Sequence, residues 1–133
     1  NSKNGKINCK KRFGKSIAKR APAMLLTIID RKLGYQNRTL KKIDTYATKA
    51  SQFNHITREY SKKQLSERWN AFGDFLIQRD LYSAFLIGNT NKTLNAVDVD
   101  LCNTKWEGFV KLHNDEVEHL KQSQSKTLRW FIA

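Results

Sequence analysis

Asp80 is the residue of this chain best placed for chemistry, in the stretch 78–86 that reads Gln-Arg-Asp-Leu-Tyr-Ser-Ala-Phe-Leu. Apolar residues recur around it at spacings of three and four, namely Ile77, Leu81, Ala84 and Phe85. That spacing places them on one face of a helix, which we expect over residues 76–88. A carboxylate at the edge of a buried helix face is a candidate ligand for a hard cation such as Mg²⁺. On periodicity alone, the simpler interpretation is an exposed Asp80 that pairs with Arg79 or with water.

Two other helices are expected to support this stretch. The first covers residues 22–33, because Pro22 suits an initial helical position and Gly34 is placed to end the helix. Its apolar stripe predicts that this helix packs in the core and carries no functional residue. The second covers residues 105–122, where Thr104 and Glu107 have the spacing of a capping box. Beyond it, residues 128–132 form an apolar terminus that could dock onto the core or onto a missing partner segment.

The β structure is expected to be sparse. Residues 39–46 weakly favour a strand, although Lys41 and Lys42 interrupt the alternation. A hairpin is expected within residues 52–73. Its packing would come from aromatic side chains, namely Phe53, Tyr60, Trp69, Phe72 and Phe75. The predicted fold class is therefore α+β and mostly helical.

The charge of the chain is high and uneven. Its 133 residues carry a net charge of +13. Residues 1–70 hold 18 Lys and Arg against 4 Asp and Glu, whereas residues 71–133 hold 7 against 8. Such a polarised chain is expected to present a basic face to a polyanion, with nucleic acid favoured over an anionic membrane. A solvated basic surface is the alternative.

The compartment is expected to be the cytoplasm. Cys9 and Cys102 do not make a disulfide framework, so reduced thiols are the simpler assumption. No apolar run approaches the ~20 residues that a membrane-spanning helix needs, and no signal peptide is visible. We therefore expect no membrane partner.

Four separated motifs lie along roughly residues 10–86. They are Arg-Phe-Gly-Lys-Ser-Ile-Ala-Lys-Arg-Ala-Pro at 12–22, Thr-Lys-Ala-Ser-Gln at 48–52, Lys-Gln-Leu-Ser-Glu-Arg-Trp at 63–69, and the stretch at 78–86. In sequence and in order they resemble the C-terminal part of the transposon-encoded TnpB (OrfB) proteins, which are RNA-guided nucleases. The resemblance implies a C-terminal fragment of an RNase H-like (RuvC) domain. Guide RNA or DNA would be its partner, with an N-terminal nuclease portion as a further candidate partner.

The resemblance also divides the chain into four parts. Residues 1–20 would be a basic connecting segment, and 21–48 a RuvC-like helix and strand. Residues 49–75 would be a zinc ribbon without its metal ligands, and 76–133 the helix with Asp80 and a helical tail. Where the family carries two cysteine pairs, this chain has residues 54–57 and 70–73 without a cysteine. Because structural zinc needs four ligands, and His55 is a lone one, we expect no bound zinc.

The family's nuclease centre uses three carboxylates that hold two Mg²⁺ ions. By motif position, Asp80 matches the last of the three, and the segments that carry the other two are not recognisable here. One carboxylate cannot hold two divalent ions, so the chain alone is not expected to cleave DNA. Mg²⁺ would belong to the intact family site only.

Basic side chains are the candidates for phosphate contacts, which position a nucleic acid without reading its sequence. The candidates are Lys10, Lys11, Arg12, Lys15, Lys19, Arg20, Lys62, Lys63, Arg68 and Arg79. Three functions remain open at this point. The chain is a catalytically incomplete part of a TnpB-like nuclease that binds nucleic acid, a repurposed RNA- or DNA-binding regulator, or a remnant that no longer folds.

Overall fold

The computed structural model describes residues 21–64 and 66–133, in two compact units divided between Lys41 and Lys42. The candidate phosphate contacts at positions 10–20 lie outside the described residues. In the smaller unit, α2 (Pro22–Gly34) begins at Pro22 as expected and ends with Tyr35 as its C-cap. Its apolar side chains are exposed, with Met24 at 63% and Leu25 at 57%. None of the buried core residues of the described chain lies on this helix, and its expected role as core scaffold stays a prediction.

The strand predicted at residues 39–46 is wrong. Residues 38–44 form no regular structure, and α3 (Thr45–Thr48) follows them. The backbone N–H of Leu40 donates to the Asp30 carboxylate at 2.9 Å instead of to a neighbouring strand. Asp44 caps α3, since its side chain accepts from the backbone N–H groups of Tyr46 and Ala47 at 2.9 and 3.0 Å. These residues favour a strand by propensity, but they have no neighbouring strand to pair with and therefore form none.

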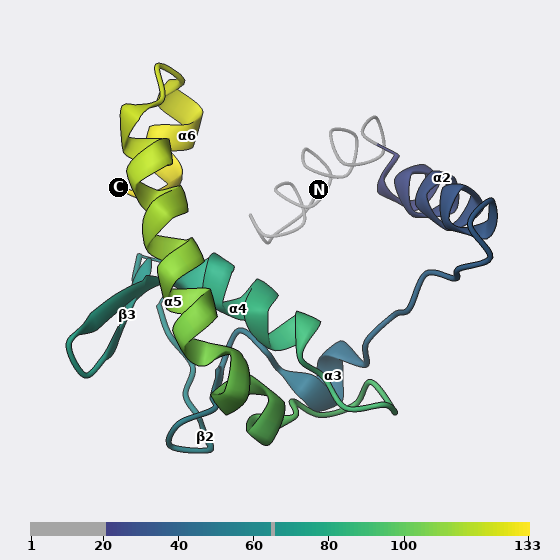
Figure 1. Cartoon of the computed structure of the whole chain (residues 1–133), viewed down its shortest axis with the longest axis horizontal. Helices are drawn as coiled ribbons and strands as arrows, with labels where there is room; N and C mark the ends of the chain where they lie inside the picture. Colours follow the sequence, from purple (N-terminus) through teal and green to yellow (C-terminus); the bar gives the residue numbers. More distant parts are fainter. Residues whose placement is uncertain (1–20, 65) are drawn as a thin grey trace, which may run out of the picture. The chain divides into compact units, whose positions relative to one another are not determined.

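The larger unit holds two antiparallel hairpins in place of one (Figure 1). The first pairs β1 (Phe53–Asn54) with β2 (Glu59–Tyr60), and the second pairs β3 (Trp69–Phe72) with β4 (Phe75–Gln78). The tight turn of the second hairpin contains Gly73 with φ of 59°, in the left-handed region that glycine tolerates. Because 75–78 are strand residues, α4 (Arg79–Gly88) begins three residues later than predicted.

The longest helix, α5 (Val99–Gln122), ends where it was predicted but begins six residues earlier. Asp98 caps it by accepting from the N–H of Leu101 at 3.0 Å. The predicted capping box is wrong, because the hydroxyl of Thr104 lies inside the helix and donates to the carbonyl of Asp100. The C-terminal apolar residues form a short helix, α6 (Lys126–Phe131), which contacts α5.

The core of the larger unit lies where both hairpins meet α4 and α5. Its buried members come from every one of these elements, namely Phe53, Phe72, Ile77, Tyr82, Leu86, Cys102 and Val110. The architecture is α+β, as predicted, with small antiparallel sheets beside helices. No helix among the described residues has the length and apolar character needed to cross a membrane.

Candidate nucleic-acid interface

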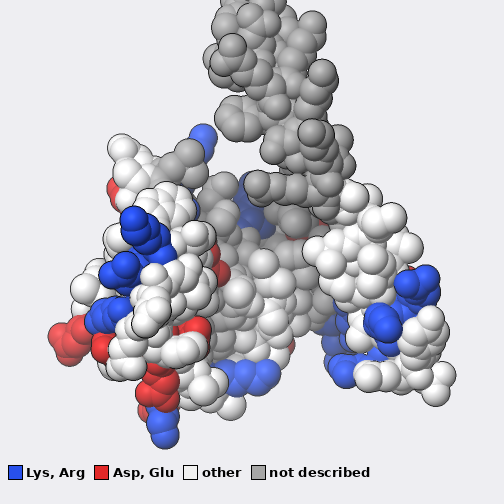
Figure 2. All heavy atoms as spheres, turned by 90° about the horizontal axis from the view of Figure 1, so that it is seen from above, with Lys and Arg blue, Asp and Glu red and all other residues white. Residues whose placement is uncertain are grey.

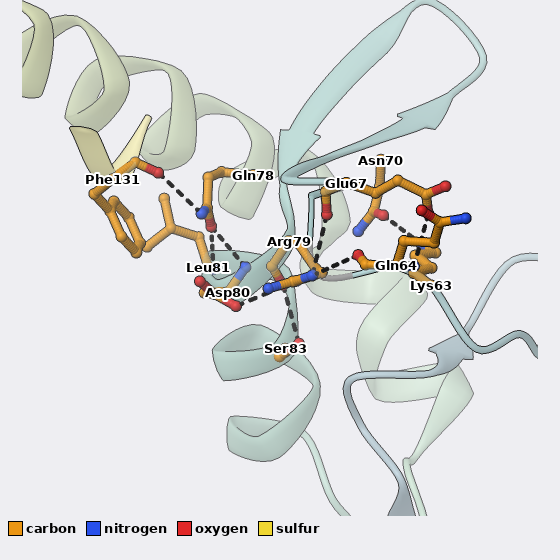
Figure 3. Close-up of polar contacts among 10 residues, drawn as sticks. All are labelled: Lys63, Gln64, Glu67, Asn70, Gln78, Arg79, Asp80, Leu81, Ser83 and Phe131. Atoms are coloured by element: carbon orange, nitrogen blue, oxygen red, sulfur yellow. Dashed lines mark hydrogen bonds and ion pairs between the residues drawn. The ribbon is translucent and has the colours of Figure 1, made fainter. Parts of the chain in front are cut away.

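The junction between β4 and α4 is held by Gln78, whose side chain is fully buried (Figure 3). Its Oε1 accepts from the backbone N–H groups of Asp80 and Leu81, at 2.6 and 2.9 Å, and so caps α4. Its Nε2 donates to the carbonyl of Phe131 at 3.3 Å, which ties α6 to this point. Its backbone N–H donates to Nε2 of His113 on α5 at 2.9 Å. One residue thus fixes the positions of three helices.

Arg79 follows at the first position of α4 and clamps the loop that precedes β3 (Figure 3). Its Nη1 donates to the carbonyls of Gln64 and Glu67 at 3.2 and 3.1 Å. Its Nε lies 3.4 Å from the Asp80 carboxylate, and only 17% of its side chain is exposed. Arg79 was predicted to contact phosphate, and no observation tests that role. Its hydrogen bonds hold the loop before β3 against the first turn of α4.

Asp80 lies in the first turn of α4, with half of its side chain exposed. It is paired with Arg79, which is the simpler of the two interpretations that the sequence left open. Within residues 21–64 and 66–133, no three His, Cys, Asp or Glu side chains gather as metal ligands would. The described residues therefore do not fit a two-magnesium centre by themselves, and no catalytic step is derived from Asp80 alone.

Three of the remaining candidate residues lie on the loop that Arg79 clamps or directly beside it. Lys62 is exposed, and the ammonium of Lys63 donates to the side-chain oxygen of Asn70. Burial lowers the pKa of Lys63; Glu67 opposes that shift and Arg79 adds to it. The guanidinium of Arg68 lies over the indole of Trp130, 3.9 Å from the ring centroid. The loop that precedes β3 thus carries three basic residues, and Arg68 forms a surface with Trp130 of α6.

Sequence reasoning missed the other side of this surface, which α6 provides. Lys126, Arg129 and Trp130 are exposed on α6, and none was among the candidates. The signal available was the Arg-Trp pair at 129–130 in a tail that was treated as apolar. Its proximity to Arg68 spans 62 positions of the chain and could not be read from local patterns.

The segment predicted to be a metal-free ribbon is built around His55, which is 1% exposed. The hydroxyl oxygen of Tyr82 accepts from the backbone N–H of His55 at 3.0 Å and lies 2.7 Å from its Nδ1. Burial raises the pKa of Tyr82 to about 12, opposed in part by the His55 hydrogen bond, so the hydroxyl keeps its proton. The hydroxyl and Nδ1 share a hydrogen bond whose donor depends on the imidazole tautomer.

The rest of the His55 ring faces aromatic side chains. The centroid distances to Trp106, Phe85 and Phe72 are 4.8, 6.0 and 6.4 Å. Nε2 is buried and has no hydrogen-bond partner within the described residues. Burial lowers the pKa of His55, as expected for an imidazole that cannot be hydrated. The His55–Phe72 contact also brings together the two segments 54–57 and 70–73.

The expected packing of the ribbon needs one correction. Phe53 and Tyr60 do pair across the first hairpin, with centroids 4.8 Å apart. Phe75, however, is exposed, and Trp69 packs against His113 of α5. The aromatic residues therefore join the hairpins to the helices and do not close a separate hairpin core.

Comparison with known proteins adds no family assignment, since no protein-family model, curated protein or solved structure matches this chain.

Proposed function

We propose that this chain is the nucleic-acid-binding C-terminal part of a TnpB-like, RNA-guided nuclease, and that it is catalytically incomplete alone. Its partner is the sugar–phosphate backbone of guide RNA or DNA. The observation that carries the proposal is the placement of charge. Residues 1–41 hold 12 Lys and Arg against a single acid, Asp30. The larger unit, residues 42–133, holds 13 against 11.

A net charge of +11 on 41 residues attracts a polyanion, and its affinity depends on counterion release. The larger unit is close to neutral, and Figure 2 shows basic and acidic side chains interspersed on its visible face around α5 and α6. A basic surface that merely keeps a protein soluble has no reason to be confined to one unit. The uneven distribution therefore favours a nucleic-acid partner.

Two features of the larger unit support the family part of the proposal. Asp80 occupies the first turn of the helix that directly follows the second hairpin, where the family's last carboxylate would be. The rings of His55 and Phe72, from the two hairpins, have centroids 6.4 Å apart, which suits a ribbon that is held together without a metal. An RNase H-like sheet, two further carboxylates and Mg²⁺ would come from an N-terminal portion of the nuclease. Zinc would not be needed, and the expected site of action is the cytoplasm.

The test is the binding of labelled single-stranded RNA and duplex DNA across a salt series. In one variant, Lys10, Lys11 and Lys15 become Gln. In the control, Lys92, Lys105 and Lys111, which belong to the near-neutral unit, become Gln. Each lost phosphate contact is expected to reduce the slope of log Kobs against log salt by about 0.9 for duplex DNA. The first variant should lose slope and the control should not; equal losses would contradict the proposal.

A further inference from the structure

We propose that Trp130 and Arg68 form a stacking platform for an unpaired nucleobase, so that the larger unit binds single-stranded RNA or DNA in preference to duplex. This inference rests on the proposed function and adds to it a site and a class of ligand. Exposed basic residues of the same two segments, Lys62, Lys126 and Arg129, are the candidates for contacts with the phosphates on either side of the stacked base.

Trp130 is unusual among the large apolar residues of the chain. Its exposed fraction is 61%, whereas the other two tryptophans, Trp69 and Trp106, are partly buried. One face of the ring is covered by the guanidinium of Arg68, at 3.9 Å from the centroid. The remaining surface is open to solvent. An aromatic ring backed by a guanidinium presents a flat face of the kind on which bases of single-stranded nucleic acids stack.

Both halves of the platform are anchored independently. The carbonyl of Phe131, next to Trp130, accepts from the buried side chain of Gln78 at 3.3 Å. The carbonyl of Arg68 accepts from the backbone N–H of Arg79 at 2.8 Å. The two residues therefore meet because α6 and the loop before β3 are both tied to the start of α4. A platform held in this way costs little ordering when a base stacks on it.

The charge of the larger unit is concentrated at these two segments. Residues 61–68 and 123–131 hold five Lys and Arg, against Glu67 as the single acid. The rest of the unit holds 8 Lys and Arg against 10 Asp and Glu. The basic excess of an otherwise slightly acidic unit thus belongs to the two segments that supply Arg68 and Trp130. Aromatic and basic groups interleaved on one surface fit an unpaired strand, because duplex bases keep their faces stacked on one another.

The experiment measures the binding of fluorescein-labelled oligothymidine, an abasic strand with the same number of phosphates, and a duplex hairpin to the full chain at fixed salt. Trp130→Leu removes the ring, and Trp130→Phe keeps an aromatic face. Tyr46→Leu is the matched control, because Tyr46 is also an exposed aromatic residue, at 89%, on α3. Arg68→Lys keeps the charge but loses the planar guanidinium. Far-UV circular dichroism verifies that each variant is folded.

Trp130→Leu is expected to weaken oligothymidine binding about 10-fold to 100-fold, down to the affinity for the abasic strand. Trp130→Phe and Tyr46→Leu should retain most of the affinity, and Arg68→Lys should lie between. The slope against salt should stay unchanged in Trp130→Leu, because no phosphate contact is removed.

Equal binding of the three ligands by Trp130→Leu and the wild-type chain would overturn the platform and leave the proposed function standing. Competition by a polyglutamate peptide as strong as that by oligothymidine of equal charge would overturn it in favour of an acidic protein partner. Failure of the wild-type chain to bind any of the three nucleic acids would contradict the proposed function itself.

Discussion

His55 is a buried titratable residue whose surroundings favour the neutral imidazole. Its imidazole is buried among aromatic rings, and its one side-chain partner is the hydroxyl of Tyr82. The other titratable group near this hydroxyl is Cys102, whose pKa burial raises to about 11, so both stay neutral at ordinary pH. Burial disfavours the charged imidazolium and so lowers the pKa of His55. The imidazole therefore links the stability of the larger unit to pH.

The sign of this link follows from the lowered pKa of His55. Below its unfolded value of 6.5, the unfolded chain binds a proton that the folded chain excludes. We expect the free energy of unfolding to be constant above that value and to fall as the pH drops toward the folded pKa. Urea titrations between pH 7.5 and 5 measure it. His55→Phe should flatten the dependence, whereas His119→Gln, at an exposed position, should not; a steep dependence in both variants would contradict this role.

Asp80 has only a small part in stability. Its carboxylate is half exposed, pairs with Arg79 and lies in the first turn of α4. Asp80→Asn should lower the free energy of unfolding by about 0.3–1 kcal/mol, through the ion pair and the helix dipole. It should not weaken nucleic-acid binding, because it removes a negative charge. Asp74→Asn, in the exposed hairpin turn, is the control, and a loss of several kcal/mol or of affinity only in Asp80→Asn would contradict this description.

At the scale of elements, Gln78 holds the arrangement of α4, α5 and α6. Gln78→Ala removes the cap of α4 and the hydrogen bond to Phe131, and it should destabilise the larger unit by about 2–4 kcal/mol. Gln122→Ala, at the exposed end of α5, should change stability by less than about 0.5 kcal/mol. Chemical denaturation monitored by circular dichroism compares the two. An equal effect of both substitutions would show that the junction does not hold the helices.

The hairpins are expected to hold together without metal. Aromatic contacts around His55 occupy the place where the two turns approach one another. Addition of zinc should therefore not raise the melting temperature, and a chelator should not lower it. Elemental analysis of the purified chain measures the same property, and one equivalent of tightly bound zinc would contradict it.

Elements with a clear local pattern were predictable from the sequence. The start of α2 followed from Pro22, and the ends of α4 and α5 from their breakers and periodicity. The hairpins were misjudged because strands of two to four residues are too short to show alternation. The first six residues of α5 were missed because Thr104 and Glu107 offered a second capping pattern, whereas Asp98 is the cap.

The candidate site was predictable only on one side. The basic residues Lys62, Lys63 and Arg68 stood out in the sequence by their charge. Trp130 did not stand out, because its candidate role depends on two tertiary contacts. Arg68, which is distant in the chain, covers one face of its ring, and Gln78 holds the neighbouring Phe131. Local patterns report composition, whereas a platform made of two distant segments depends on tertiary contacts.

At the scale of the whole molecule, charge and packing are divided between the two units. The larger unit has a packed core and little net charge, and the first 41 residues carry nearly all of the basic excess. Such a division suits the proposal that the basic first 41 residues bind a polyanion while the larger unit presents the platform of Arg68 and Trp130. It also leaves Asp80 without the further carboxylates that cleavage would need among the described residues.

The proposal that the chain binds nucleic acid without cleaving it is tested most directly by a binding measurement. Labelled duplex DNA and single-stranded RNA are titrated across a salt series, with Mg²⁺ or with a chelator. The integrity of the strands is then analysed. We predict a steep linear fall of log Kobs with log salt, and intact strands in both conditions. Weak binding at moderate salt with no slope would contradict the assignment of the basic half to nucleic acid. Cleavage that requires Mg²⁺ and disappears in Asp80→Ala would contradict the conclusion that the chain is catalytically incomplete.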